Sequence, residues 1–243
     1  GQSIAHCVSI SVRDSALLLD ATSGPEIGSP YHAPYQKDSF LSSLEKDPKN
    51  LKIAYIVPES ISIDAEVKDV MTKTFSLLES LGHSVESKSI DLPTDEIMTT
   101  IAAVISSSLA NKIDEMEKQI GKNLDNTMLE NVTLQMQKNG KEVLAKDYIQ
   151  AVKTNHKIGY EFEKMFLDYD ILLSPVLAKP PVEIGNIDLN TTDFADYAEK
   201  LSRYTPFTGI FNQSGHPSIS LPLYRTPKNL PVGTMLTASF GNE

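Results

Sequence analysis

A chain of 243 residues, 40% of them hydrophobic, is long enough to bury a sizeable core, so a globular fold is expected. Its formal net charge of -10 argues against a nucleic-acid partner, because a phosphate backbone is bound by a basic surface. The single cysteine, Cys7, excludes an internal disulfide and suits a reducing cytoplasm. No apolar run approaches the roughly 20 residues that cross a bilayer, so we expect no membrane partner.

The first fifty residues predict one helix followed by a surface connection. Ser11 is placed to cap a helix that begins at Val12, and Gly24-Pro25 ends it. The polar, proline-spaced stretch Ser29–Asn50 is expected to run over the surface. The apolar face of the helix comprises Val12, Ala16, Leu18 and Leu19.

The next forty residues predict a strand, a helix and a second strand. Leu51–Val57 is a short apolar run ended by Pro58, which is typical of a buried strand. Asp64 is placed to cap a helix whose apolar residues repeat at helical spacing as far as Gly82. Val85–Leu92 alternates weakly, which favours a strand near a sheet edge. Such a βαβ unit pairs its strands in parallel.

The middle of the chain is predicted to be mainly helical. Asp95–Asn139 has helical spacing and lacks strand signals, and a further helix is expected over Lys146–Leu167. Asp170–Ser174 is then a strand, Lys179–Asp193 a long loop, and Ala195–Tyr204 a short helix. Alternating strands and helices predict an α/β fold, with residues 1–243 forming a single domain piece.

The C-terminal part predicts two more strands. Ser218–Leu223 is a strand closed by Pro222, and Val232–Ala238 is its successor. His216 lies in a Gly-His-Pro corner, where a structural role is expected, and Asn212 is interpreted as a turn-former. The five histidines lack metal-ligand spacing, and no phosphate-loop or dinucleotide motif is present, so no metal or cofactor site is predicted.

Three blocks of the sequence, in this order, resemble blocks of the amidase signature family. The first is SVRDSALLLDATSGPEIGSP at Ser11–Pro30, and the second is YDILLSP at Tyr169–Pro175. The third is the pattern Asn-x-x-Gly-x-Pro-x-Ile-Ser-x-Pro with a following Leu-Pro-Val-Gly, here Asn212, Gly215, Pro217, Ile219, Ser220, Pro222 and Leu230–Gly233.

The resemblance implies half of a large mixed β-sheet flanked by helices on both sides. Family members hydrolyse amides without a cofactor, using a Ser, cis-Ser, Lys triad. Its Gly/Ser-rich loop has no counterpart here, so no catalytic residue is expected in this chain. We therefore interpret the chain as the C-terminal half of a cytoplasmic amidase whose N-terminal half carries the nucleophile. The partners expected are that half and a small-molecule amide, and a homodimer is left open.

The resemblance places the substrate wall just before the third block. On that basis Thr205, Phe207 and Thr208 are predicted to bind the substrate, although Phe207 could equally be a core residue. By this resemblance, amidotransferases that bind glutamine have an aspartate at the position that Thr205 occupies in this sequence. The neutral side chain here favours an uncharged linear or cyclic amide, such as an aminohexanoate oligomer.

Two rival functions remain open from the sequence. One is a non-catalytic binding or scaffold protein that keeps half of an amidase fold. The other is a protein like the A subunit of glutamyl-tRNA amidotransferase, against which the absence of an acidic residue at Thr205 counts mildly.

Overall fold

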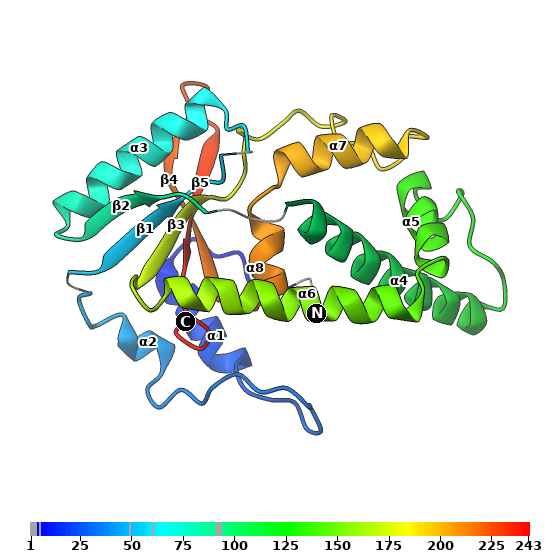
Figure 1. Ribbon diagram of the computed structural model, residues 1–243, viewed down its shortest axis with the longest axis horizontal. Coiled ribbons are helices and arrows are strands. Elements are labelled where there is room, and N and C mark those ends of the chain that lie inside the picture. The colour runs from blue at the N-terminus through cyan, green and yellow to red at the C-terminus, as the bar shows by residue number, and fades with distance from the viewer. Residues whose placement is uncertain (1–3, 5, 49, 60, 91–93) are drawn as a thin grey trace.

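A computed structural model describes residues 4, 6–48, 50–59, 61–90 and 94–243, and shows one mixed sheet with helices around it (Figure 1). The strands are β1 (Lys52–Ile56), β2 (Ser84–Lys88), β3 (Ile171–Pro175), β4 (Ser218–Arg225) and β5 (Pro231–Thr237). The helices in the described residues are α1 (Val12–Thr22), α2 (Phe40–Ser43), α3 (Ala65–Ser80), α4 (Thr94–Ile120), α5 (Asn131–Lys141), α6 (Ala145–Met165), α7 (Phe194–Tyr204) and α8 (Thr208–Ser214).

The sheet has the strand order β2-β1-β3-β5-β4. Strand β1 pairs in parallel with β2 and β3, whereas β5 runs antiparallel to both β3 and β4. The predicted βαβ unit is confirmed, because α3 joins the parallel strands β1 and β2. The strand predicted near an edge, β2, does lie at the edge.

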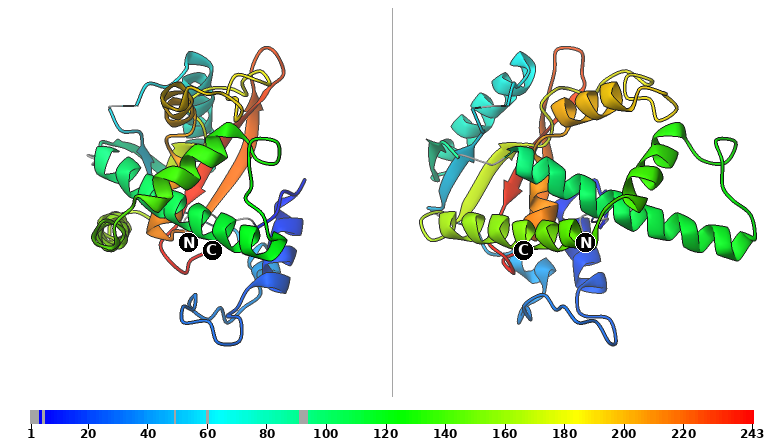
Figure 2. Two further views of the ribbon diagram at one scale, coloured as in Figure 1. Left: turned by 90° about the vertical axis from the view of Figure 1, so that its right-hand side faces the viewer. Right: turned by 45° about the vertical axis from the view of Figure 1, so that its right-hand side comes forward.

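Helices cover both faces of the sheet, as the α/β fold class requires (Figure 2). Helix α3 covers one face, where the hydroxyls of Thr74 and Thr234 lie 3.3 Å apart in the core. On the other face, α6 and α8 bring Phe162 and Phe211 together with ring centroids 5.1 Å apart. Helices α4 and α5 and the start of α6 extend away from the sheet (Figures 1 and 2). None of the described helices is long and apolar enough to span a bilayer.

The predicted helix starts are confirmed by their capping hydrogen bonds. The Ser11 hydroxyl accepts from the Asp14 amide, and the Asp64 carboxylate accepts from the Glu66 amide. Gly82 follows α3 with a φ of 90°, a backbone conformation that glycine adopts without strain. These boundaries were predictable because capping depends on residues within one turn of the helix end.

Several predicted boundaries are wrong, and two short helices were not predicted. The helical prediction for Asp95–Asn139 is confirmed as two helices, α4 and α5, separated by residues 121–130. The strand predicted over Val85–Leu92 ends at Lys88, residues 89 and 90 are not in a strand, and residues 91 and 92 lie outside the described residues. The two unpredicted helices are α2 and α8.

Pro222 does not close its strand. Strand β4 continues to Arg225, with a shift in register between Leu221 and Tyr224. Proline is tolerated there because β4 is an edge strand, whose outward amide positions need no partner in the sheet. The strand predicted to end at Ala238 ends at Thr237.

Loss of the α3 cap should destabilise the chain measurably. We expect Asp64→Ala to lower the free energy of unfolding by about 1 kcal/mol, because the Glu66 amide loses its acceptor. Asp64→Asn retains an acceptor at the same position and serves as the control, with a loss of a few tenths of a kcal/mol at most. Urea unfolding monitored by circular dichroism compares the two. Equal stabilities of the two variants would contradict the capping role.

Candidate functional site

The candidate site lies where the parallel strands β1 and β3 end at their carboxyl termini. In open α/β sheets, ligands bind outside the carboxyl ends of the parallel strands. The segment after β3 bonds to the end of α7 and to the residue before α3. The Ala178 amide donates to the Tyr204 carbonyl (3.1 Å), and the Ala178 carbonyl accepts from the Asp64 amide (2.9 Å). Ala178 is fully buried. The end of α7 and the start of α3 are therefore held together directly beside Thr205.

The three predicted substrate residues lie in the turn between α7 and α8. Thr205 is half-buried, and both its amide (2.8 Å) and its hydroxyl (3.1 Å) donate to the Leu201 carbonyl. Thr208 is half-buried and begins α8. Phe207 is only 4% exposed and lies in the hydrophobic core. Thus the two threonines are partly accessible from outside, whereas Phe207 supports the turn from the core.

A small apolar cavity lies beneath this turn. Its volume is about 20 Å³, enough for roughly one water molecule and far too small for an amide substrate. Substrate contact through this chain would therefore involve the outer surface of the turn. The lining residues that belong to the turn and α8 are Pro206, Phe207, Ile210 and Phe211, and Ser174 lines the cavity from β3.

A larger cavity, of about 590 Å³, opens between the end of β2 and α6. Its size falls in the range of small-molecule sites. Two of its lysines already have partners in the chain, since Lys157 lies 3.8 Å from Glu96 and Lys164 lies 3.1 Å from Glu161. It does not contain Thr205 or Thr208. The predicted substrate residues and this cavity are therefore separate features of the described structure.

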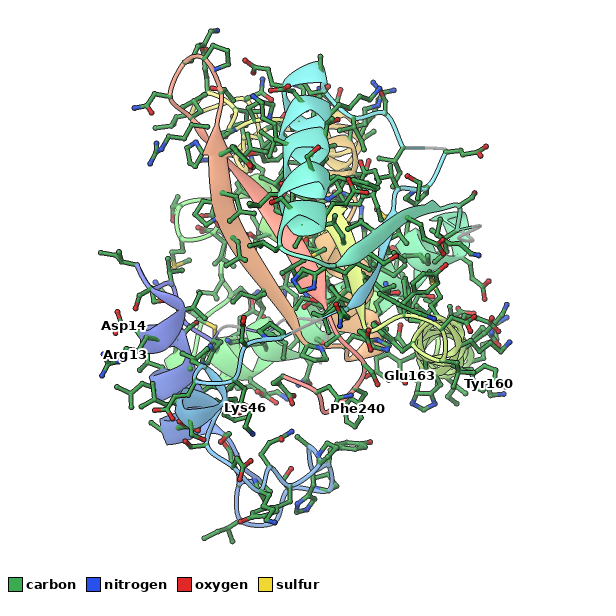
Figure 3. The ribbon with its side chains drawn as sticks, turned by 90° about the vertical axis from the view of Figure 1, so that its left-hand side faces the viewer. Arg13, Asp14, Lys46, Tyr160, Glu163 and Phe240 are labelled. Atoms are coloured by element: carbon green, nitrogen blue, oxygen red, sulfur yellow. The ribbon has the colours of Figure 1, made fainter. Side chains whose placement is uncertain are left out.

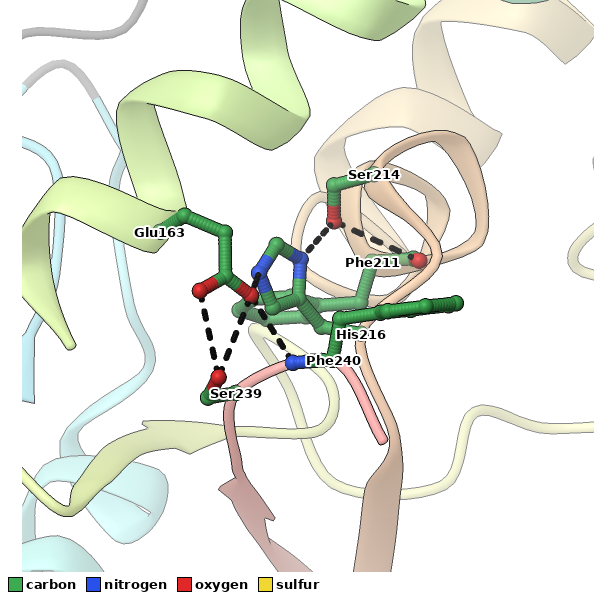
Figure 4. A network of polar contacts seen from close by, with 6 residues as sticks. All are labelled: Glu163, Phe211, Ser214, His216, Ser239 and Phe240. Atoms are coloured by element: carbon green, nitrogen blue, oxygen red, sulfur yellow. Dashed lines mark hydrogen bonds and ion pairs between the residues drawn. The ribbon is translucent and has the colours of Figure 1, made fainter. Parts of the chain in front are cut away.

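A polar network centred on Glu163 fastens α8 and the C-terminal segment to α6 (Figure 4). The Glu163 carboxylate accepts from the Phe240 amide (2.8 Å) and the Ser239 hydroxyl (3.1 Å), and it lies 3.0 Å from His216 Nε2. The other ring nitrogen, Nδ1, lies 2.8 Å from the Ser214 hydroxyl. His216 also stacks on Phe166, with ring centroids 5.3 Å apart.

Burial and hydrogen bonding together set the protonation states of this network. Desolvation lowers the pKa of His216 below its ordinary value of 6.5, although the neighbouring Glu163 charge opposes that effect. Desolvation also opposes ionisation of Glu163, but hydrogen bonds from Phe240 and Ser239, together with the neighbouring His216, outweigh it and lower the pKa of that carboxyl. At neutral pH, His216 is therefore neutral, donating from Nε2 to Glu163 and accepting at Nδ1 from Ser214.

The order Ser214, His216, Glu163 has the connectivity of a hydrolase triad, but the geometry favours a structural role. The His216 side chain is 1% exposed, so a substrate cannot reach it. Neither of the two cavities contains Ser214 or His216. The structural role predicted for the Gly-His-Pro corner agrees with this arrangement.

Two features of this region, helix α8 and the Glu163–His216 contact, differ from what the sequence predicts. Asn212 was interpreted as a turn-former, yet it lies within α8. Gly215, with a φ of 79°, ends that helix, and a glycine after a short polar run was the signal that could have revealed it. The pairing of Glu163 with His216 had no comparable signal, because the two residues are 53 positions apart.

Comparison with known proteins decides the family. The family model described as Amidase matches residues 4–243. The chain belongs to the amidase family. This chain is 25% identical, over 96% of its length, to a 6-aminohexanoate-cyclic-dimer hydrolase of Paenarthrobacter ureafaciens. It is 28% identical, over 93% of its length, to the A subunit of the glutamyl-tRNA(Gln) amidotransferase of Halothermothrix orenii.

Solved structures of amidase signature enzymes share the fold of this chain. A structure of 6-aminohexanoate cyclic dimer hydrolase superposes with a TM-score of 0.84 and 24% identity, covering 96% of this chain and 50% of that one. The A subunit of the glutamyl-tRNA(Gln) amidotransferase of Thermotoga maritima gives a TM-score of 0.64 and 26% identity, over 95% and 48% of the two chains.

The chain spans about half the length of the curated relatives it matches. The hydrolase match covers 49% of that protein, and the Halothermothrix match covers 50%. The resemblance seen in the sequence is thus confirmed at the level of the family and of the α/β fold.

Proposed function

We propose that this chain is the C-terminal half of a serine amidohydrolase that cleaves a carboxylic amide bond, with its nucleophile on the other half. The observation that carries the proposal is the family match over residues 4–243, which nevertheless accounts for about half of each relative. Amide hydrolysis requires an activated nucleophile, a proton relay and donors facing the developing oxyanion. In this proposal the chain supplies part of the substrate wall instead.

The wall is the outer surface of the turn that holds Thr205 and Thr208. The Thr205 hydroxyl hydrogen is engaged by the Leu201 carbonyl, which leaves the hydroxyl oxygen as a neutral acceptor. Phe207, fixed in the core, holds the turn in place. A neutral wall suits an uncharged amide, and a cyclic dimer of 6-aminohexanoate is an amide of that class. The similarity to an enzyme named for that compound supports the same substrate class.

The test compares two lengths of the protein. The protein at its natural length, which in this proposal includes the other half, is expected to release amine from 6-aminohexanoate cyclic dimer. A serine-directed phosphonate should abolish that release. The 243-residue chain alone should show no turnover. Phosphonate-sensitive turnover by the 243-residue chain alone would contradict the half-domain role.

A charge at the wall should impair the reaction with a neutral amide. We expect Thr205→Asp, in the protein at its natural length, to lower kcat/KM by about tenfold or more, because a carboxylate would have to be desolvated against an uncharged substrate. Thr205→Ser retains the hydroxyl and should stay within about threefold of the parent. Steady-state kinetics measures both. If the Thr205→Asp variant is as active as the parent, Thr205 does not contact the substrate.

The second candidate is a protein resembling the A subunit of glutamyl-tRNA(Gln) amidotransferase. The observation that favours it is 28% identity over 93% of this chain. Glutamine is the substrate that separates the two candidates. Release of ammonia from glutamine, without hydrolysis of the cyclic dimer, would favour the amidotransferase function. Hydrolysis of neither compound, nor of other neutral amides, would favour the binding or scaffold function.

A further inference from the structure

A cavity of about 590 Å³ lies between the end of β2 and α6, apart from the predicted substrate residues. Figure 3 shows α6 end-on at the lower right, with β2 passing above it. Glu163 lies on another side of the same helix, where it accepts from the Phe240 amide, and it does not line the cavity. The cavity is therefore separate from the Glu163 network as well.

One wall of this cavity is apolar. Ile158, Phe162 and Met165 line it at intervals of three or four positions, which places them on one face of α6. Ile158 and Phe162 belong to the hydrophobic core, whereas Met165 is half-buried. Ile90, just after β2, is half-buried and lines the cavity too. A hydrocarbon group placed against these side chains would leave water, which is favourable.

Most of the charges that line the cavity are already paired. Toward the start of α6, the Glu96 carboxylate accepts from the Thr154 hydroxyl (2.9 Å) and lies 3.8 Å from the Lys157 ammonium. The Lys164 ammonium lies 3.1 Å from the Glu161 carboxylate. None of these groups needs a ligand to balance its charge.

Two charged side chains at the other end of the cavity, Lys88 and Asp168, are different. Neither forms an ion pair with any residue that the structure describes. The Lys88 ammonium lies 6.0 Å from the centroid of the Tyr169 ring, and Asp168 directly precedes Tyr169 in the chain. The Tyr169 hydroxyl donates to the Glu86 carboxylate, which holds the ring in place. A cation and an anion that lack partners in the described chain therefore lie beside one aromatic ring.

We propose that this cavity binds an α-amino acid with an apolar side chain. The ligand carboxylate pairs with Lys88 and the ligand ammonium pairs with Asp168, because an α-amino acid has both charges at the same end. Its side chain lies along Met165, Phe162 and Ile158. The apolar wall begins directly beside the anion, since the Asp168 amide donates to the Met165 carbonyl (3.1 Å). This inference does not depend on the proposed amide hydrolysis.

Methyl NMR tests the proposal at the cavity itself. In the protein at its natural length, with isotope-labelled methionine methyl groups, the Met165 signal is the one that a Met165→Leu variant loses. L-Norleucine is the probe, and it should shift this signal with a Kd of roughly 1 mM. Met116, on α4 and outside the cavity, is the control and should not move. A Met165 signal unaffected by norleucine would overturn the proposal.

An isomer of the probe tests where the two charges must lie. 6-Aminohexanoate has the same atoms as norleucine, but its ammonium and carboxylate groups are at opposite ends of the chain. Measured at the Met165 signal, it should bind at least about threefold more weakly, because it can pair with only one of Lys88 and Asp168 at a time. Equal or tighter binding of 6-aminohexanoate, or of hexanoate, which lacks the ammonium group, would also overturn the proposal.

Two variants test the charged side chains. Lys88→Ala and Asp168→Asn should each raise the Kd of norleucine about threefold or more, because each removes one ion pair with the ligand. Lys68→Ala and Asp47→Asn change exposed residues of the same types outside the cavity, and they should leave the Kd unchanged. A Kd that is the same in all four variants as in the parent would show that Lys88 and Asp168 do not hold the ligand.

Discussion

Replacing Gly140 with alanine is expected to lower the free energy of unfolding by about 3 kcal/mol, the upper part of the range for overpacked cores. Gly140 lies in α5 where that helix crosses α4. A β-carbon at this position would lie 2.0 Å from the Ser106 carbonyl oxygen and 2.9 Å from the Ala110 β-carbon. The first of these is a backbone atom and cannot move by itself, so the two helices must separate.

The helix propensity of alanine works in the opposite direction. Alanine favours a helix interior over glycine by about 1 kcal/mol, so the measured loss is what remains after that gain. Gly209→Ala, in α8, is the matched control, because its β-carbon would meet only the Ile101 Cδ1 methyl group, at 3.2 Å. That methyl group can rotate away, and the control should be neutral or slightly stabilised. Urea unfolding of both variants measures the difference, and similar stabilities would show that α4 and α5 are not in close contact at Gly140.

Removing the Glu163 carboxylate is the second large effect. We expect Glu163→Ala to cost about 2 kcal/mol at neutral pH, because the His216 ring and the Phe240 amide lose a charged acceptor. The Glu163 side chain is partly open to water, which limits the loss. Because α8 begins at Thr208, loosening its attachment to α6 should also disturb the candidate substrate turn.

The same network predicts the pH dependence of stability. The pKa of His216 is lowered in the folded chain, so the folded state binds fewer protons than the unfolded state. The stability from His216 is fully present above pH 6.5 and is lost as the pH falls from 6.5 toward the folded-state value. The loss is at most about 1.4 kcal/mol for each pH unit below 6.5.

The Glu163→Gln variant separates the charge of Glu163 from its hydrogen bonds. The amide oxygen can still accept from His216, but the charge that favours protonated His216 is gone. We therefore expect the pKa of His216 to fall further and the stability to drop more steeply as the pH falls from 6.5 to about 5.5. Replacement of His156, an exposed histidine on the same helix, should leave the profile unchanged. Melting temperatures measured across this pH range test the prediction. Parallel profiles for Glu163→Gln and the parent would show that His216 does not cause the pH dependence of stability.

The lowered pKa of Glu163 acts over a more acidic range. Its folded-state value lies below the ordinary 4.5, so the stability it contributes is present above pH 4.5 and is lost as the pH falls through the folded value. Both groups therefore make the chain less stable in acid, in two successive steps.

The local features of the fold were determined by the sequence alone. Ser11 and Asp64 indicated the starts of α1 and α3 because a cap hydrogen bond joins residues two or three positions apart. The βαβ unit followed from the change in apolar periodicity between strand and helix. The family followed from three short blocks whose order is independent of any contact between them.

The tertiary structure decided what lies together. Neither the pairing of Glu163 with His216 nor the bond from Ala178 to Tyr204 could be predicted, because each joins segments brought together only by the sheet and its helices. Leu18 was assigned to the apolar face of α1, yet it is exposed, because α2 covers only one side of that helix. Periodicity shows that a side chain is apolar, but burial depends on what packs against it.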